Sequence, residues 1–116
     1  MRKLIIKESK WYRGLGSGSR LLVPLDGRMC CLGFDSLACG ATEQQILGVT
    51  FPSNLVPTLE KQKWLYICNP SARDMGSYQS RIAEVNDDRN ITESERKNLL
   101  SELFREGGNI ELVFVP

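Results

Sequence analysis

The sequence predicts a single α+β domain over residues 1–116, in which a small antiparallel or mixed sheet from the N- and C-terminal strands packs with four or so helices. Strand-like runs lie near the two ends of the chain, and helical patterns with capping signals fill most of the middle. This segregated order favours α+β over a doubly wound sheet. With 116 residues, 41% of them hydrophobic, the chain is long enough for one core.

The N-terminal part of the chain predicts two strands joined by a glycine-rich turn. Residues 4–6 are an apolar run between charges, and with residues 11–13 they are typical of a strand or a bent strand pair. Residues 20–23 predict another strand, which stops at Pro24. The glycines and serines of 14–19 would form the tip of this hairpin. Asp26 and Gly27 then predict a second tight turn.

Two short helices are expected next. One face of the first would carry Cys30, Phe34, Leu37 and Ala38, which recur at helical spacing. Gly40 would end this helix. Thr42 and Gln45 match a capping box, so a second helix should run to about Leu47 and end at Gly48.

The second half predicts a helical pair and a closing strand. A proline-bounded loop is expected at 51–57 and a strand at 64–68. A helix over 78–86 would bury Tyr78, Ile82 and Val85. A capping box at residues 92–95 opens the next helix, terminated by glycines at 107–108. Its apolar face would carry Leu99, Leu100, Leu103 and Phe104. The apolar run 110–115 predicts a strand inside the sheet.

The absence of histidine excludes the Ser-His-Asp and Cys-His arrangements and most catalytic zinc sites. We therefore expect no catalytic residue, no cofactor and no metal. The first turn of a helix could activate Cys30 and Cys31 as thiolates, but cysteine is much more often a small core residue, so a structural role is favoured. Cys30, Cys31 and Cys39, with Cys68, are expected to stay thiols in a cytoplasmic protein, since the apolar run at 4–6 is too short for a leader or a membrane span.

Binding residues are more plausible than catalytic ones. Trp11, Tyr12 and Arg13 could anchor a protein partner or stack on bases, although alternation along a strand would place some rings in the core. The glycine loop could cradle a phosphate with its amides, or serve only as a flexible tip. The candidate partner- or ligand-binding residues are Trp11, Tyr12, Arg13, Gly14, Gly16, Gly18, Arg20 and Arg28.

Charge is unevenly distributed along a chain of net charge +1. Residues 1–28 hold seven basic and two acidic side chains, whereas 81–116 hold five basic and eight acidic ones. This asymmetry permits an anionic, nucleotide-like ligand on the N-terminal part, unless the two halves pair with each other. Residues 86–90 offer oxygen atoms that could hold a divalent ion, but they are more typical of a helix cap and a solvated turn.

Several segments resemble a group of small bacteriophage and prophage proteins of unknown function. They are residues 11–14, 26–34, 38–40, 48–49 and 86–88, with Asp-Gly-Arg-Met-Cys-Cys-Leu-Gly the most specific part. The resemblance implies a phage setting, in which short accessory proteins often disable a host factor. The leading hypothesis is thus a non-enzymatic protein that inhibits or redirects a host protein, such as a defence system in the manner of an anti-CRISPR. The alternatives are a nucleotide-binding protein and a cysteine-thiolate enzyme.

Overall fold

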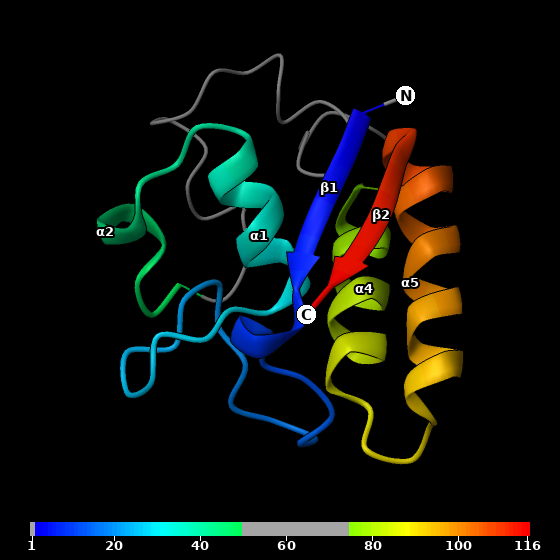
Figure 1. Ribbon diagram of the computed structural model, residues 1–116, viewed down its shortest axis with the longest axis horizontal. Coiled ribbons are helices and arrows are strands. Elements are labelled where there is room, and N and C mark those ends of the chain that lie inside the picture. Colours follow the sequence, from blue (N-terminus) through cyan, green and yellow to red (C-terminus); the bar gives the residue numbers. More distant parts are fainter. Residues whose placement is uncertain (1, 50–74) are drawn as a thin grey trace.

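The computed structural model describes residues 2–49 and 75–116, which form helices packed on a two-stranded sheet (Figure 1). The elements, in chain order, are β1 (Arg2–Lys7), η1 (Glu8–Lys10), α1 (Cys31–Ala38), α2 (Glu43–Ile46), α4 (Met75–Asp87), α5 (Glu93–Gly108) and β2 (Ile110–Val115). The combination of helices with a small sheet from the two terminal strands is confirmed. The loop expected at 51–57 and the strand expected at 64–68 lie outside the described residues.

The terminal strands pair in parallel, so the two-stranded sheet is neither antiparallel nor mixed, contrary to the expectation. The register places Leu4 beside Leu112 and Ile6 beside Phe114. Parallel strands need a crossover connection, and here the helices between β1 and β2 return the chain to the end of the sheet where it began. Strand-type runs at the two ends of a sequence do not by themselves fix their relative direction.

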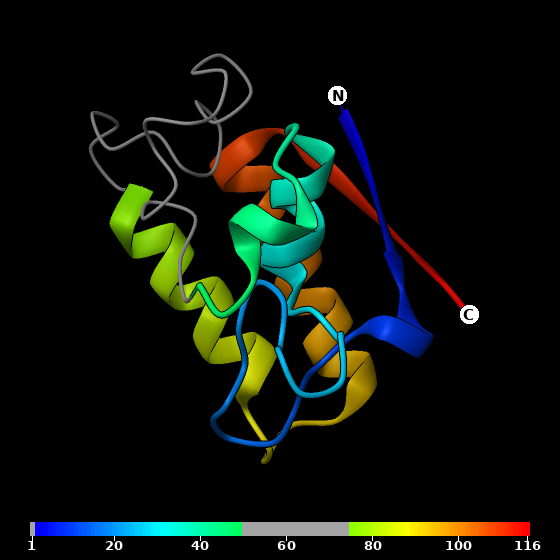
Figure 2. The same cartoon turned by 90° about the vertical axis from the view of Figure 1, so that its left-hand side faces the viewer.

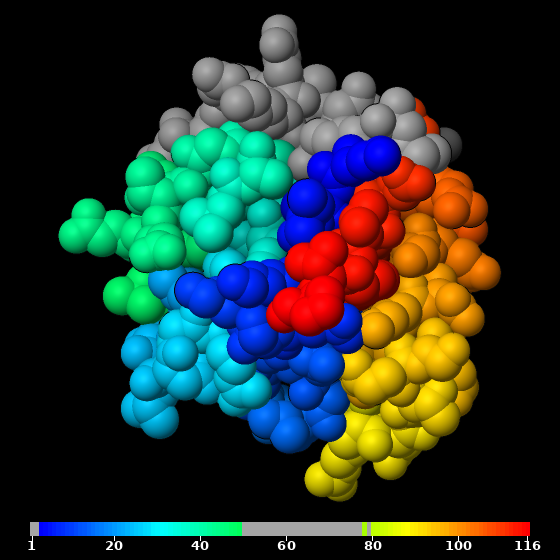
Figure 3. Space-filling model, viewed as in Figure 1, coloured from blue at the N-terminus to red at the C-terminus, as the bar shows by residue number. Residues whose placement is uncertain are grey.

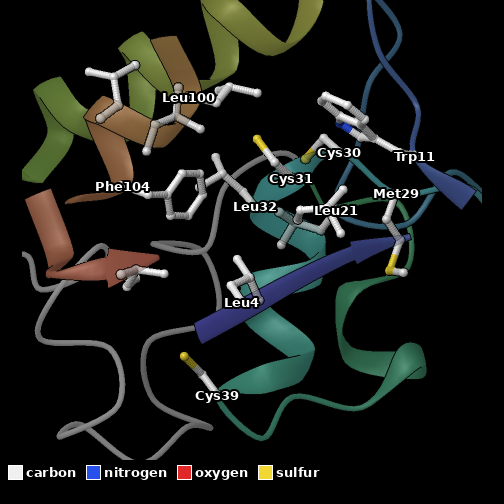
Figure 4. Close-up of a cluster of buried hydrophobic side chains, with 14 of the residues drawn as sticks. Leu4, Trp11, Leu21, Met29, Cys30, Cys31, Leu32, Cys39, Leu100 and Phe104 are labelled. Atoms are coloured by element: carbon white, nitrogen blue, oxygen red, sulfur yellow. The ribbon is translucent and has the colours of Figure 1, made fainter. Parts of the chain in front are cut away.

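Helices α1 and α5 pack against one face of this sheet, and α4 packs against both of them on the side away from the strands (Figure 2). Leu4 and Ile6 point into the core beneath them, whereas Ile5 is 58% exposed on the other face. The alternation of β1 is therefore that of a strand with one covered face. Figure 4 shows the buried cluster between the sheet and the helices.

The hairpin expected over residues 11–23 is wrong, because these residues hydrogen-bond to other segments. Trp11 forms a single bridge with Met29, and Leu22 forms one with Leu47. The N–H of Leu21 donates to the carbonyl of Val49 at 2.8 Å. No strand ladder joins the two flanks of the glycine loop within the described residues.

The face expected for helix α1 is confirmed at Cys30, which is buried, and in part at Phe34 and Leu37, which pack against the core, but not at Ala38. Ala38 is exposed and Phe34 is half-buried, while Cys31, Leu32 and Asp35 are buried. Gly33 explains this rotation, because a Cβ there would overlap the carbonyl oxygen of Leu21. The side of α1 that carries Gly33 thus faces the backbone of Leu21.

Both capping boxes are confirmed, but the expected end of α5 is wrong. Thr42 and Thr92 each accept a hydrogen bond from the third backbone N–H of their helix. Gly107 lies within α5, where a Cβ would stand 2.9 Å from the ring of Tyr78 in α4. This glycine permits close helix packing, and the left-handed residue Asn109, with φ 52°, ends the helix. Leu99 is 40% exposed rather than part of the buried face.

Candidate functional site

Trp11 lies in the core and is not a surface anchor (Figure 4). Its Nε1–H donates to Oδ1 of Asn86 at 2.8 Å. The same oxygen accepts the backbone N–H of Cys31 at 3.2 Å, and the Asn86 amide nitrogen donates to the carbonyl of Tyr12 at 3.0 Å. The first residue of the predicted aromatic cluster therefore joins three segments inside the protein.

Arg13 is engaged within the protein as well. Its guanidinium lies 4.3 Å from the centroid of the Trp11 ring, and Nε donates to Glu93 at 2.8 Å. Burial raises the pKa of Glu93, but hydrogen bonds and charges from Arg13 and Arg96 outweigh that effect and lower it. Arg13 thus holds the segment after β1 against the start of α5.

The glycine loop caps the C-terminal end of α4. The N–H of Gly14 donates to the carbonyl of Asn86 at 2.9 Å, and that of Gly16 donates to the carbonyl of Asp87 at 2.7 Å. Both glycines have positive φ, which lets successive amides turn toward the helix. The last carbonyls of a helix lack partners within the helix, so the loop satisfies them. These two amides are consequently unavailable to a phosphate.

Arg96 completes this cap, and sequence reasoning missed it. Its buried guanidinium donates to the carbonyls of Val85, Asn86 and Asp88 at 2.6–3.0 Å. A cation beside these carbonyls also interacts favourably with the helix dipole. Residues 86–90 were expected to form a solvated turn or an ion site. Their first residue, Asn86, is instead buried, and its carbonyl accepts hydrogen bonds from Gly14 and Arg96.

Tyr12, Gly18 and Arg28 lie together, apart from this cap. The Tyr12 hydroxyl donates to the carbonyl of Ser17 at 3.1 Å, and a Cβ on Gly18 would stand 2.7 Å from that hydroxyl. The Arg28 guanidinium lies 4.8 Å from the centroid of the Tyr12 ring. Arg20 is engaged locally through a 2.7 Å hydrogen bond to the carbonyl of Ser19.

Arg28 braces a tight turn over residues 23–28, which we call the leucine turn. Val23 N–H donates to the Arg28 carbonyl at 2.7 Å, and Gly27 N–H donates to the Val23 carbonyl at 2.9 Å. Arg28 Nε donates to Asp26 at 2.9 Å. The backbone N–H and the guanidinium of Arg28 lower the pKa of Asp26.

Leu25 is 96% exposed within this turn. Pro24 beside it is exposed too, and it lies next to Gly48, whose Cβ would stand 3.7 Å from the proline ring. The neighbouring Leu47 is half-exposed, so apolar surface extends from the turn to the end of α2. Figure 3 shows this side of the molecule, where the cyan turn adjoins the green residues around α2. The only sequence signal for Leu25 was an apolar residue inside a predicted turn.

The described cysteines are free thiols in the core. Burial raises the pKa of Cys30 to about 11 and that of Cys31 well above its ordinary value. Cys30 occupies the N-cap position of α1, where a thiolate could gain from the helix dipole, but desolvation is the larger effect. A thiolate nucleophile at either position is disfavoured, and Cys68 lies outside the described residues.

An open hollow of about 520 Å³ adjoins Gly16, and its charge is mainly negative. Glu84, Asp87 and Asp88 line it, and Arg89 is the single basic side chain among the described lining residues. Such a surface does not favour an anionic nucleotide. Within residues 2–49 and 75–116, no group of three or more Cys, Asp or Glu side chains is placed to hold a metal ion.

The basic and acidic parts of the sequence pair with each other at several points. Besides Arg13 with Glu93, Lys97 lies 2.7 Å from Glu8, and Lys3 lies 4.0 Å from Glu111. These contacts reduce the positive field expected around the N-terminal segment. None of the described helices has the length and apolar character to cross a bilayer.

Comparison with known proteins returns no matching family model, no matching curated protein and no matching solved structure.

Proposed function

We propose that this chain is a non-enzymatic binding protein whose leucine turn inserts Leu25 into an apolar pocket of a protein partner. The observation that carries the proposal is the 96% exposure of Leu25 on a turn held by two backbone hydrogen bonds and the Arg28–Asp26 pair. Because the backbone of this turn is already held in one conformation, it loses little further freedom when Leu25 is bound.

The surroundings of Leu25 suit a protein interface. Pro24 and Leu47 extend its apolar surface, while Asp26 and Arg28 supply polar groups at its edge. Interfaces commonly combine an apolar centre with such a polar rim. When a partner covers this apolar patch, the surface of the patch is removed from water, and this removal favours binding.

The state of the reactive side chains supports binding rather than catalysis. The sequence has no histidine, and the two adjacent thiols are buried with raised pKa values. The amides of Gly14 and Gly16 are occupied by α4. Binding of a protein partner requires neither an imidazole, nor a thiolate, nor free amides in the glycine loop.

The partner we propose is a host protein met in the cytoplasm of a bacterium. The resemblance of the Asp-Gly-Arg-Met-Cys-Cys-Leu-Gly segment to phage proteins supports this choice, and that segment begins inside the leucine turn. The protein would inhibit or redirect its partner, and a defence system of the kind that anti-CRISPR proteins block is one such target.

The test compares two exposed leucines by affinity capture from bacterial lysate. Leu25→Asp should abolish capture of a specific partner without changing stability, because an almost fully exposed side chain supports little of the fold. Leu15→Asp is the matched control, since Leu15 is 56% exposed in the glycine loop and should retain capture.

Equal capture by wild-type protein and the Leu25→Asp variant would refute the role of the leucine turn. Thermal stabilisation by a nucleotide, in place of any protein capture, would instead favour a small-molecule ligand. At a hundredfold excess over its Kd such a ligand should add about 2.7 kcal/mol.

A further inference from the structure

A groove of about 160 Å³ runs between α4 and α5, away from the leucine turn. Its apolar lining is formed by Val85, Leu99 and Leu103. Leu99 is the residue that the helical pattern assigned to the core, yet it is 40% exposed beside the groove. The helical pair thus leaves apolar surface uncovered among the described residues.

The size of the groove limits what it can hold. Pockets for small-molecule ligands usually measure about 300–1,000 Å³, so this one is too small for a nucleotide. It is suited to a single apolar side chain presented by a larger molecule. A protein segment is therefore a better occupant than a free small molecule.

The charges around the groove specify the kind of segment. Glu84, Glu102 and Glu106 line it, and Arg81 is the single basic residue among its described lining. No described lysine or arginine lies within ion-pairing distance of these three glutamates. Arg81 itself lies near the ring of Tyr78, 5.7 Å from its centroid.

The negative surface continues beyond the groove. Glu84 also borders the hollow near Gly16, where Asp87 and Asp88 add two further carboxylates. An approaching positive segment would therefore meet carboxylates on both sides of α4, which favours its encounter and orientation.

We infer that the groove between α4 and α5 binds a basic segment of a partner protein, one that inserts an apolar side chain between Val85 and Leu99 and places lysine or arginine near the three glutamates. This surface is separate from the leucine turn and does not depend on the proposed role of Leu25. Acidic segments and nucleic acids are disfavoured by the same carboxylates.

The test uses three short synthetic peptides labelled with fluorescein. One carries leucines flanked by lysines, the second replaces the lysines with glutamates, and the third keeps the lysines but replaces the leucines with alanines. Fluorescence anisotropy should show saturable binding of the first peptide only, and this binding should weaken with added salt. Methyl resonances of Val85, Leu99 and Leu103 should shift during the same titration.

Variants assign the interaction to the groove. Glu102→Gln combined with Glu106→Gln should weaken binding roughly fivefold, the effect expected for two exposed ion pairs. The control pair, Glu43→Gln with Glu111→Gln, removes as much charge outside the groove and should bind like the wild type. Leu99→Ala should weaken binding, whereas Leu25→Asp should leave it unchanged and so separates this inference from the proposed function.

The inference is overturned if the lysine–leucine peptide binds no better than either of the other two. It is equally overturned if the shifted methyl groups lie away from the groove, or if the Glu102→Gln and Glu106→Gln pair behaves like its control.

Discussion

Asn86 shows how one buried polar side chain can organise a small core. Its amide accepts from the indole of Trp11 and from the backbone of Cys31, and it donates to the carbonyl of Tyr12. The Trp11 indole N–H and the Cys31 N–H would otherwise be buried without an acceptor, at a cost of about 1–3 kcal/mol each. The asparagine therefore fixes how the segment after β1, the start of α1 and the end of α4 meet.

Replacing this asparagine should destabilise the protein strongly. We expect Asn86→Ala to lower the free energy of unfolding by about 3 kcal/mol, because at least one buried donor loses its acceptor. Urea denaturation followed by tryptophan fluorescence measures the change. Asn90→Ala, at an exposed position of the following turn, should stay within about 0.5 kcal/mol. Similar losses for the two variants would contradict this role.

Burial also governs the reactivity of the two adjacent cysteines. Cys30 and Cys31 should react with iodoacetamide near neutral pH only at the rate at which the protein opens, because they are inaccessible and their pKa values are raised. Mass spectrometry of tryptic peptides follows the labelling, with urea-unfolded protein as the reference. Rapid modification of either residue in the native protein would contradict this expectation and show that a reactive thiolate is accessible in the folded state.

The raised pKa of Cys30 predicts a loss of stability in alkali. The unfolded thiol ionises near its ordinary pKa of 9.0, whereas the folded one ionises at about 11. The contribution of the protonated Cys30 thiol to the free energy of unfolding is therefore full below pH 9, and it is lost as the pH rises from 9 to about 11. Over that interval, Cys30→Ala should make the fall in unfolding free energy less steep by up to roughly 1.4 kcal/mol per pH unit. Parallel pH profiles for variant and wild type would exclude this effect.

At the scale of the elements, two glycines determine how closely helices approach their neighbours. Gly33 turns α1 toward the backbone of Leu21, and Gly107 brings α5 against Tyr78 of α4. Neither role follows from the usual treatment of glycine as a helix terminator. Both arise because the absence of a Cβ allows contacts that any other residue would block.

Gly33→Ala should therefore be among the most damaging single changes. The new Cβ meets a backbone oxygen that cannot rotate away, so we expect a loss of more than about 3 kcal/mol or failure to fold. Circular dichroism during thermal unfolding measures it. Gly27→Ala is the control, because open space surrounds that position and only its positive φ is strained, at about 1 kcal/mol. A mild effect at Gly33 would show that α1 can move away from Leu21.

At the scale of the molecule, the described α-helices all lie on one side of a parallel pair of strands (Figure 2). β1 alternates accordingly, with Leu4 only 2% exposed and Ile5 58% exposed. Binding surfaces can occupy the periphery of such a fold without disturbing its core. The two proposed binding surfaces, the leucine turn and the α4–α5 groove, both lie at this periphery.

Adjacent residues of β1 test this arrangement. Leu4→Ala should lower the free energy of unfolding by about 3 kcal/mol, since it leaves a cavity under the helices. Ile5→Ala removes a side chain of similar size from the exposed face and should cost less than about 1 kcal/mol. Denaturant unfolding of both variants gives the comparison. Equal losses would mean that the outer face of the sheet is covered in solution.

Local signals in the sequence predicted most of the regular structure. The capping boxes at Thr42 and Thr92 begin their helices because a hydroxyl three residues before a backbone N–H satisfies it whatever surrounds the helix. The segregated order of strand-type and helical patterns gave the α+β class. Burial within α1 and α5 was predicted less well, because apolar spacing alone did not account for Gly33 or for the exposure of Leu99.

The candidate site was harder to predict because its residues have partners far away in the sequence. Trp11, Arg13, Gly14 and Gly16 have the composition of a binding cluster, but Asn86, Asp87 and Glu93 engage them. Those partners lie more than seventy residues along the chain. The type of a residue tells which hydrogen bonds and ion pairs its side chain can form. Only the tertiary structure shows whether those interactions are already made with another part of the chain.

The sequence by itself determined where most helices begin and which strands close the fold, and it excluded imidazole chemistry, because these properties depend on residues close together or on composition. Tertiary structure alone decided the parallel direction of the strands, the burial of Trp11 and the exposure of Leu25. Each of these is set by packing between distant segments, where the free energy of removing apolar groups from water and pairing every buried donor outweighs local preference.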